Sequence, residues 1–150
     1  MAEVDRNRVA ALVARAFEKD VAPLYSPPGI RNFRVFAAPE AMALRAAHRH
    51  WALVAEMEGE PVGVVEVREN RHISMLFVDP ERQGAGIGRR LFDAAVERCR
   101  TENPRPTKIT VAASPNAVPV YERLGFRPAG PPAEEEGIRS VPMAFVPPSR

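Results

Sequence analysis

A glycine-rich segment between an apolar stretch and an amphipathic stretch constrains the fold of this chain most. The sequence FVDPERQGAGIGRRLF occupies residues 77–92, and its three glycines alternate with Ala and Ile before two consecutive arginines. Apolar residues then recur at every fourth position from Ile87 to Cys99, which predicts a helix that ends near residue 101. Since HISMLFV at 72–78 has the composition of a strand, the glycines are predicted to join a strand to a helix.

This arrangement of strand, glycine turn and helix suits an anion. The first N–H groups of a helix lack intrahelical partners and carry a partial positive charge, and glycines before them let the backbone approach a phosphate closely. Arg89 and Arg90 fall in the first helical turn. There the helix dipole disfavours a cation by roughly 0.3–1 kcal/mol, a penalty that a bound anion would reverse. A solvated helix start with screened charges is the alternative, and the residues alone leave both open.

The spacing of the glycines argues against two common phosphate sites. No Lys-Ser or Lys-Thr pair follows them, so a nucleotide-hydrolysing P-loop is not expected. A dinucleotide site needs Gly-x-Gly-x-x-Gly in an early strand–helix–strand unit. Here the pattern is Gly84-x-Gly86-x-Gly88, and the strand before it is expected to end an antiparallel meander.

Helices are predicted before the sheet begins. Residues 6–19 have the apolar spacing of an amphipathic helix, and two further helices are expected after Pro27 and near Pro39. The pattern then changes to that of strands at 51–57, 61–68 and 72–78. The short connections between these strands predict an antiparallel meander.

The rest of the chain predicts a mixed sheet. A strand at 108–114 follows the glycine segment and its helix, so it is expected to lie parallel to the strand at 72–78. A short helix at 115–124 should end at Gly125. The segments 126–130 and 138–146 should then form a hairpin across an acidic loop at 134–136. We therefore expect an α/β (α+β) fold whose mostly antiparallel central sheet contains one parallel strand pair and is flanked by helices.

Length and composition exclude several classes of protein. A chain of 150 residues suffices for one domain, expected over residues 1–150. The net charge of +2 does not indicate a nucleic-acid-binding protein. Cys99 is the only cysteine, which rules out an intramolecular disulfide and a four-cysteine zinc site. The N-terminal residues contain neither a signal-peptide core nor a membrane span, so a cytoplasmic location without membrane attachment is expected.

Two motifs resemble those of one known family. Gln83-x-x-Gly86-x-Gly88, between a strand and a helix, resembles the acyl-CoA pyrophosphate loop of the GNAT N-acetyltransferase superfamily. SPNAVPVYERLGF at 114–126 is similar to the next motif of that family, a short helix with a tyrosine before Leu-Gly-Phe. The order of elements over 6–146 also agrees, so the chain resembles a stand-alone, bacterial-type member with the GNAT acyl-CoA N-acyltransferase fold.

Two features depart from the family pattern. Only Ala2 to Asp5 precede the first helix, so the usual initial strand is expected to be short or missing. Ser114 stands where an asparagine commonly contacts the pantetheine arm, and Asn116 follows two positions later.

The resemblance implies acetyl-CoA as co-substrate and no metal. Acetyl-CoA would lie in a V-shaped opening between the strands at 72–78 and 108–114. Strand backbone groups would pair with pantetheine, N–H groups of the glycine segment would bind the pyrophosphate, and an N–H near Val78 would polarise the thioester carbonyl. The implied cofactor-binding residues are Leu76, Phe77, Val78, Gln83, Gly84, Ala85, Gly86, Ile87, Gly88, Arg89, Ser114 and Asn116.

Tyr121 matches the usual general acid of the family. A phenol with a pKa of about 10 is protonated at neutral pH and can protonate a departing thiolate. The alternative is a packing role beside Ala117 and Leu124, with the hydroxyl bonded to any acceptor.

Glu66 is the candidate general base for the attacking amine. It lies in an apolar strand on the same face as Val62 and Val64, where a carboxylate would take up a proton more readily than in water. The alternative is that it points into solvent and pairs with Arg68. His72 is the second candidate, and a chain of waters also stays open.

The function expected from the resemblance is transfer of an acetyl group from acetyl-CoA to a primary amine of a small molecule or of a peptide or protein. The amine would attack directly in a ternary complex. A non-catalytic acyl-CoA-binding or sensing module and a purely structural domain are the alternatives. The segment 22–33, with Tyr25 and Phe33, is interpreted either as part of an acceptor pocket or as a connector with core aromatics. The acceptor cannot be identified from the residues, and a homodimer is left open.

Overall fold

Helices form the first part of the chain. The computed structural model describes residues 3–103, 108–135 and 138–148. Its first helices are α1 (Glu3–Asp20), α2 (Pro27–Phe36) and α3 (Pro39–Ala46), with the short 3-10 helix η1 (Ala22–Leu24) after α1. Prolines open α2 and α3, as their fixed φ favours, and the Ser26 hydroxyl caps α2 by accepting from the Gly29 N–H. All three helices lie where the apolar spacing predicts them.

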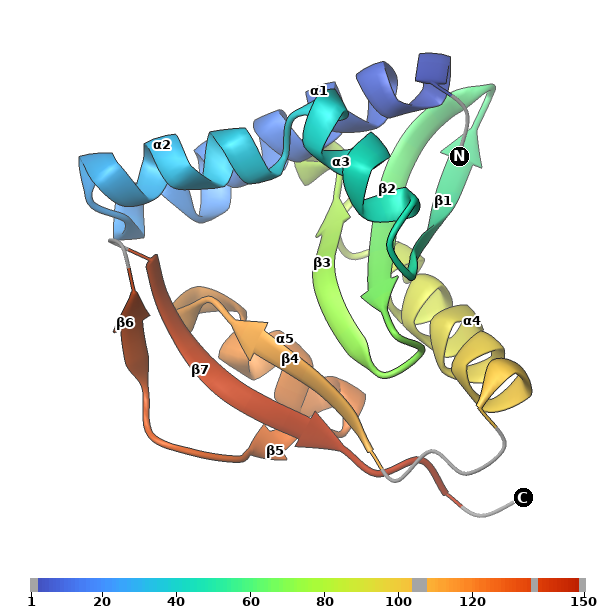
Figure 1. Cartoon of the computed structure of the whole chain (residues 1–150), viewed down its shortest axis with the longest axis vertical. Helices are drawn as coiled ribbons and strands as arrows, with labels where there is room; N and C mark the ends of the chain where they lie inside the picture. Colours follow the sequence, from blue (N-terminus) through green and yellow to red (C-terminus); the bar gives the residue numbers. More distant parts are fainter. Residues whose placement is uncertain (1–2, 104–107, 136–137, 149–150) are drawn as a thin grey trace.

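The meander, the parallel strand pair and the pairing of residues 127–128 with the last strand are as the sequence predicts. The meander consists of β1 (His50–Met57), β2 (Glu60–Arg68) and β3 (His72–Val78), all antiparallel. β4 (Ile109–Ala113) lies parallel to β3, and β7 (Ile138–Phe145) lies antiparallel to β4. β5 (Arg127–Pro128) and β6 (Ala133–Glu135) both pair with β7. The expected mixed sheet with one parallel pair is confirmed (Figure 1).

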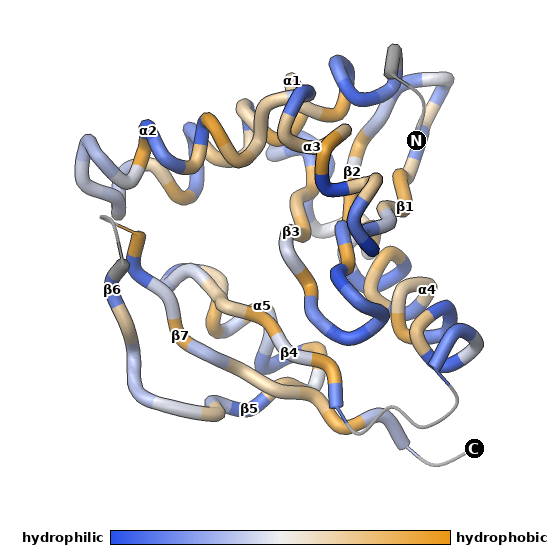
Figure 2. Tube along the Cα trace, viewed as in Figure 1, coloured by the Kyte–Doolittle hydropathy of each residue, from blue (hydrophilic) through white to orange (hydrophobic). Residues whose placement is uncertain are grey.

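Helices cover both faces of the meander. On one face α1 packs Val9 and Leu12 against Val64 of β2. On the other face α4 (Ile87–Glu102) packs Leu91 against Val65. Neighbouring residues of β2 therefore point to opposite cores, as the alternation of a strand requires. Apolar and polar residues alternate around α1 and α4, as expected of helices with one buried side (Figure 2).

β3 and β4 separate soon after they meet. Their parallel pairing contains only His72 with Thr110 and Ile73 with Val111. The pairing of β2 with β3 shifts at the same place, because Glu66 lies opposite Met75 and Val67 opposite Ile73. Ser74 is therefore an extra residue, a β-bulge, and bulges bend a strand and increase its twist. Beyond this bulge β3 turns away from β4 (Figure 1).

Two expectations concern the ends of the chain. α1 begins at Glu3, the first residue that the structure describes, so the expectation of a short or missing strand before it falls on residues outside the described part. The acidic loop was placed wrongly: residues 133–135 form β6, and residue 136 lies outside the described residues. Charged side chains are well tolerated on an edge strand exposed to water. The Glu134 carboxylate also forms an ion pair with Arg139 on β7, with 3.9 Å between Oε2 and Nε.

Candidate functional site

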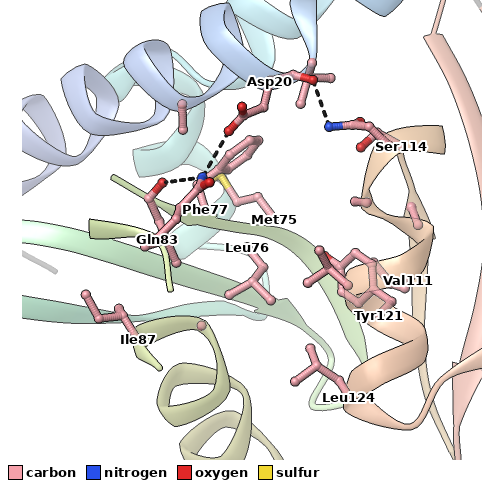
Figure 3. A pocket seen from close by; sticks show the side chains of 18 of the residues that line it. Asp20, Met75, Leu76, Phe77, Gln83, Ile87, Val111, Ser114, Tyr121 and Leu124 are labelled. Atoms are coloured by element: carbon pink, nitrogen blue, oxygen red, sulfur yellow. Dashed lines mark hydrogen bonds between the residues drawn. The ribbon is translucent and has the colours of Figure 1, made fainter. Parts of the chain in front are cut away.

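A cavity of about 780 Å³ lies where β3 and β4 separate. This volume is typical of small-molecule sites, which span roughly 300–1,000 Å³. The cavity is enclosed by the end of α1, by β3, by the glycine segment, by β4 and by the short helices η3 (Pro115–Ala117) and α5 (Val118–Leu124) (Figure 3). The predicted cofactor-binding residues that line it are Leu76, Phe77, Val78, Gln83, Gly84, Gly86, Ile87, Gly88, Arg89, Ser114 and Asn116. Ala85 is exposed and does not belong to the lining.

The start of α4 presents backbone N–H groups to this cavity. Gly86 is the N-cap with φ at 81°, a conformation that favours glycine, and no side chain caps the helix. The first backbone donors of α4 therefore lack a side-chain acceptor, which is the condition for binding an anion. Gly63 on β2 lets the helix approach the sheet, since a Cβ there would lie 2.8 Å from Leu91 Cδ1.

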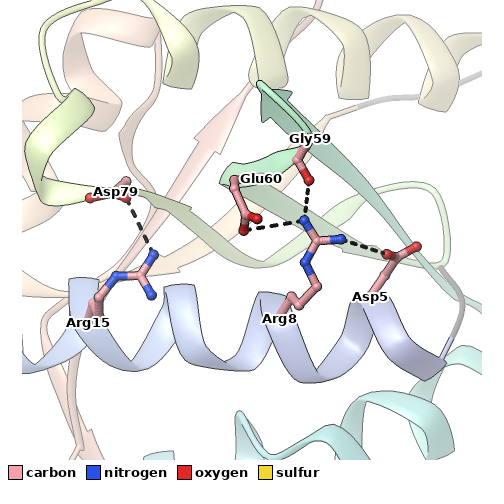
Figure 4. A network of polar contacts seen from close by, with 6 residues as sticks. All are labelled: Asp5, Arg8, Arg15, Gly59, Glu60 and Asp79. Atoms are coloured by element: carbon pink, nitrogen blue, oxygen red, sulfur yellow. Dashed lines mark hydrogen bonds and ion pairs between the residues drawn. The ribbon is translucent and has the colours of Figure 1, made fainter.

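Helix α1 fixes the segment that leads into the glycines. The Asp79 carboxylate accepts from the Glu81 N–H at 3.0 Å and opens the 3-10 helix η2 (Pro80–Arg82). Arg15 of α1 lies 3.4 Å from the same carboxylate. Nearer the start of α1, the Arg8 guanidinium donates to the Gly59 carbonyl in the β1–β2 turn (Figure 4). These contacts hold α1 against the meander and position the glycine segment.

Three arginines line the cavity near the glycine segment and α5. They are Arg82, Arg89 and Arg123, of which the sequence analysis singled out Arg89. The Arg89 guanidinium donates to the carbonyl of Arg123 at 2.9 Å, which joins the start of α4 to the end of α5. Arg90 does not belong to the lining. The positive charges gather at one end of the cavity and suit a ligand with several phosphates.

Tyr121 has the properties expected of a proton donor. Its side chain lines the cavity and is buried, and burial raises the pKa of its phenol above the ordinary value. Its ring packs edge-on against Phe126, with 5.3 Å between centroids. None of the hydrogen bonds of the described residues involves its hydroxyl, and no buried polar side-chain atom of this part lacks a partner. The hydroxyl must therefore reach the open space of the cavity, which disfavours the alternative of a capped packing tyrosine.

The structure does not bring Glu66 to the cavity. Its carboxylate is buried on β2 and accepts from Arg45 of α3, with 2.7 Å between Nε and Oε1. The alternative considered from the sequence, a solvent-exposed Glu66 side chain paired with Arg68, is wrong. The carboxylate is buried, and its partner is Arg45 of helix α3. Met75 lies opposite Glu66 in the register and lines the cavity in its place.

His72 also lies away from the cavity. It sits where β3 and β4 pair, and its Nδ1 is 2.7 Å from the Thr110 hydroxyl. Burial, together with Arg68, Arg71 and His50, lowers the pKa of His72 to about 4. His72 does not belong to the cavity lining, so it is poorly placed as the base.

Asp20, which the sequence analysis did not single out, lies at the centre of the site. Its Oδ2 accepts from the Gln83 amide at 3.0 Å, and its main-chain carbonyl accepts from the Asn116 amide at 2.8 Å. The end of α1 thus joins the glycine segment to the segment after β4 (Figure 3). The Asn116 amide is already engaged by α1, and Ser114 lines the cavity without capping η3.

Tyr25 and Phe33 fit both of the roles considered for the segment 22–33. They line the cavity beside Asp20, as expected of an acceptor pocket. They also pack in the core, since Phe33 stacks on Phe17 with 4.0 Å between centroids and Tyr25 meets the same ring edge-on at 5.4 Å.

Comparisons with known proteins agree with this geometry. Residues 21–146 match the model of the acetyltransferase (GNAT) domain. The chain is 29% identical over 123 residues to YafP, an uncharacterized N-acetyltransferase of Escherichia coli. The aligned region covers 82% of this chain and 75% of YafP. It is also 36% identical over 84 residues to an uncharacterized N-acetyltransferase of Methanocaldococcus jannaschii. That aligned region covers 49% of this chain but only 37% of the relative.

A solved structure has the same fold. The PaiA N-acetyltransferase of Thermoplasma acidophilum, in complex with coenzyme A, superposes with a TM-score of 0.80 at 16% identity, over 97% of this chain and 95% of that one. The family match extends from η1 to β7 and so includes the glycine segment, the divergent strands and Tyr121. This chain belongs to the GNAT acetyltransferase family.

Proposed function

We propose that the protein transfers an acetyl group from acetyl-CoA to a primary amine, which attacks the thioester directly in a ternary complex. One observation carries the proposal: a single cavity contains an uncapped helix N-terminus, an unpaired strand edge and a buried tyrosine whose hydroxyl is free to act. Each of these features serves a different part of the reaction.

The residues present suit acetyl-CoA. The β3–β4 ladder ends at Ile73, so the edge of β3 from Ser74 to Val78 can pair with the amide groups of an extended pantetheine arm. The N–H groups at the start of α4, with Arg82 and Arg89 beside them, would bind the phosphates. When bound, acetyl-CoA supplies an acetyl group activated as a thioester.

The chain's own groups would then carry out three tasks. A backbone N–H on the free edge of β3 would stabilise negative charge on the carbonyl oxygen under attack. Tyr121 would give its proton to the departing thiolate, and burial keeps its phenol protonated at neutral pH. An alkylammonium acceptor has a pKa of about 10 and must lose a proton first. Because Arg45 engages Glu66 outside the cavity, we propose that this proton leaves through water rather than directly to Glu66.

Calorimetric titration with acetyl-CoA tests the cofactor site. Gly86→Glu would place a carboxylate and a strained φ at the helix start, and it should abolish binding that is micromolar in the wild type. Gly59→Glu is the matched control, since Gly59 also has a positive φ, 78°, but lies in the β1–β2 turn away from the lining. Absence of binding by the wild type, or equal losses in both variants, would contradict the proposed site.

Release of CoA in the presence of amines tests catalysis. The wild type should release CoA only when both acetyl-CoA and a suitable primary amine are present. A protein that binds acetyl-CoA but acetylates no amine would be the non-catalytic module considered as the alternative.

Three further expectations stay predictions. The single domain over residues 1–150 should resist limited proteolysis as one unit. The cytoplasmic location is tested by cell fractionation, and none of the helices among the described residues is long and apolar enough to cross a membrane. The question of a homodimer is answered by sedimentation of the purified protein.

A further inference from the structure

The two groups proposed for catalysis stand on opposite walls of the cavity. The β3 wall, formed by β3 and the glycine segment, carries the strand edge that would hold the thioester. The β4 wall, formed by β4, η3 and α5, carries Tyr121 (Figure 3). The last backbone pair between β3 and β4 joins Ile73 to Val111. Beyond that pair, the separation of the walls depends on side chains and on the helices that flank the sheet.

On one face of the sheet, α4 joins the two sides of the cavity by apolar packing. Its Phe92 ring lies 5.4 Å from the ring of Phe126, which follows α5, and 5.2 Å from the ring of Phe145 on β7. Leu91 of the same helix belongs to one buried cluster with Val65 of β2. One continuous core therefore holds both sides on this face.

On the opposite face, α1 packs on the side of the β3 wall. The apolar clusters of described residues that contain α1 side chains include residues of β1, β2, β3 and the helices before the sheet, but none of β4 or α5. The link from α1 to the β4 wall is instead polar. The Asn116 amide in η3 donates to the main-chain carbonyl of Asp20, the last residue of α1, at 2.8 Å.

The Asp20 side chain extends this link to the β3 wall. Its Oδ2 accepts from the Gln83 amide at 3.0 Å, so one residue of α1 is bonded to both walls (Figure 3). Gln83 and Asn116 are both exposed. Loss of either bond should therefore leave the core intact and change chiefly how the walls are held relative to each other.

We propose that Asp20 and Asn116 are positioning residues, which hold Tyr121 at the distance from the thioester where it can protonate the departing thiolate. This inference rests on the proposed transferase function. Misplacement of a reacting group by about 1 Å can lower a rate roughly 100-fold. The resemblance implied that Asn116 contacts the cofactor, whereas its bond to α1 gives it the task of fixing the wall that carries α5.

Asn116→Ala and Asn116→Leu test this, because both remove the N–H donor without adding a charge. The kcat of CoA release should fall about 10- to 100-fold, while the Kd of acetyl-CoA, measured by calorimetry, stays within about twofold. A residue that binds the cofactor would give the reverse result, a raised Kd and an unchanged kcat. Glu122→Ala is the matched control, since Glu122 is exposed on α5 and lies outside the lining. It should leave both constants unchanged.

The amines offered in this assay are ethylamine, benzylamine, glycinamide and Nα-acetyl-lysine amide, and kcat is compared for the amine that the wild type acetylates fastest. Hydrogen exchange adds a measurement that needs no amine. Asn116→Ala should speed exchange in α5 and leave exchange in α4 unchanged, because the link holds only the first of these helices to α1. Urea unfolding should give all variants the midpoint of the wild type.

Two variants of Asp20 test the other half of the link. Asp20→Ala removes the acceptor for the Gln83 amide and should lower kcat in the same way as Asn116→Ala. Asp20→Asn keeps an oxygen that can accept from Gln83, so it should restore most of the lost kcat. An equally large loss in Asp20→Asn would show that the charge matters rather than the bond, and it would refute the inference.

A double variant shows whether the link acts through Tyr121. Tyr121→Phe removes the proton donor, so the position of this ring then no longer affects protonation of the thiolate. In that background Asn116→Ala should lower kcat by less than about twofold, since residues that act as a unit are not additive. The same loss in both backgrounds would refute an action through Tyr121.

The outcomes separate this inference from the transferase function. A wild type that binds no acetyl-CoA, or that binds it and acetylates none of the amines, refutes the transferase function and the inference with it. If the wild type is active and both Asn116 variants keep its kcat, or α5 exchanges as slowly in them as in the wild type, only the inference is refuted. A raised Kd with an unchanged kcat makes Asn116 a cofactor contact and also refutes the inference alone.

Discussion

Removal of Arg45 should destabilise the protein strongly without changing the cavity. Arg45 donates to Glu66 at 2.7 and 3.3 Å and to the Phe36 carbonyl at 2.7 Å. The Glu66 side chain is 4% exposed, so Arg45→Met leaves an unpaired carboxylate in the core. Breaking a buried pair in this way costs about 3–5 kcal/mol. At roughly 2–4 °C of Tm per kcal/mol for a chain of this size, Tm should fall by roughly 6–20 °C.

A double-mutant cycle measured by urea unfolding checks this reasoning. Glu66→Met alone should also destabilise, but the double variant should recover a large part of the loss, because an apolar pair of similar volume replaces the ions. Arg34→Met is the matched control, since the Arg34–Glu18 pair is exposed and should contribute less than about 1 kcal/mol. An equally small loss for Arg45→Met, or a double variant as unstable as the sum of its parents, would refute the argument.

The same pair decides whether Glu66 takes part in catalysis. Glu66→Gln keeps the size of the side chain and one acceptor for Arg45, so enough folded enzyme should remain for kinetics at low temperature. With Glu66 outside the cavity, the shape of the pH profile of kcat/KM should stay that of the wild type. Loss of the limb that reports the base would instead assign Glu66 that role, as the sequence analysis predicted.

Two further predictions concern the titratable residues of the sheet and α5. Tyr121→Phe should lower kcat by roughly 100- to 10,000-fold, the usual contribution of a general acid. Calorimetry should give an unchanged Kd for acetyl-CoA, and an unchanged kcat would contradict the proposed acid. His72 has a pKa of about 4 in the folded protein and an ordinary value of 6.5. Between these values the unfolded chain binds more protons than the folded protein, so the free energy of unfolding should fall as pH drops from 6.5 toward 4. His72→Asn should flatten this part of the stability–pH profile, and parallel profiles for the two proteins would rule out His72 as its source.

The parts of the fold that depend on local pattern could be predicted from the sequence. The change from helical to strand spacing after α3 separates the helical layer from the meander, and the glycines before α4 with Tyr121 on α5 belong to continuous motifs. The Ser74 bulge could not be predicted, because it is defined by the register between β2 and β3. The run of glutamates was assigned to a loop by composition, although pairing with β7 places Glu134 in a strand.

The placement of charged groups depends on contacts between segments that are distant in the sequence. This explains the main differences between the site predicted from the sequence and the site in the structure. Glu66 has the same local sequence whether it faces an amine or Arg45, and only the docking of α3 on β2 decides between the two. Asp20 looks like an ordinary polar residue at a helix end, yet it meets Gln83 and Asn116, which lie 63 and 96 positions further along the chain. Local motifs of the family mark the half of the cavity that would bind CoA. No local motif marks the contacts that Asp20 makes with Gln83 and Asn116, because they form only where the end of α1 meets the segments after β3 and after β4.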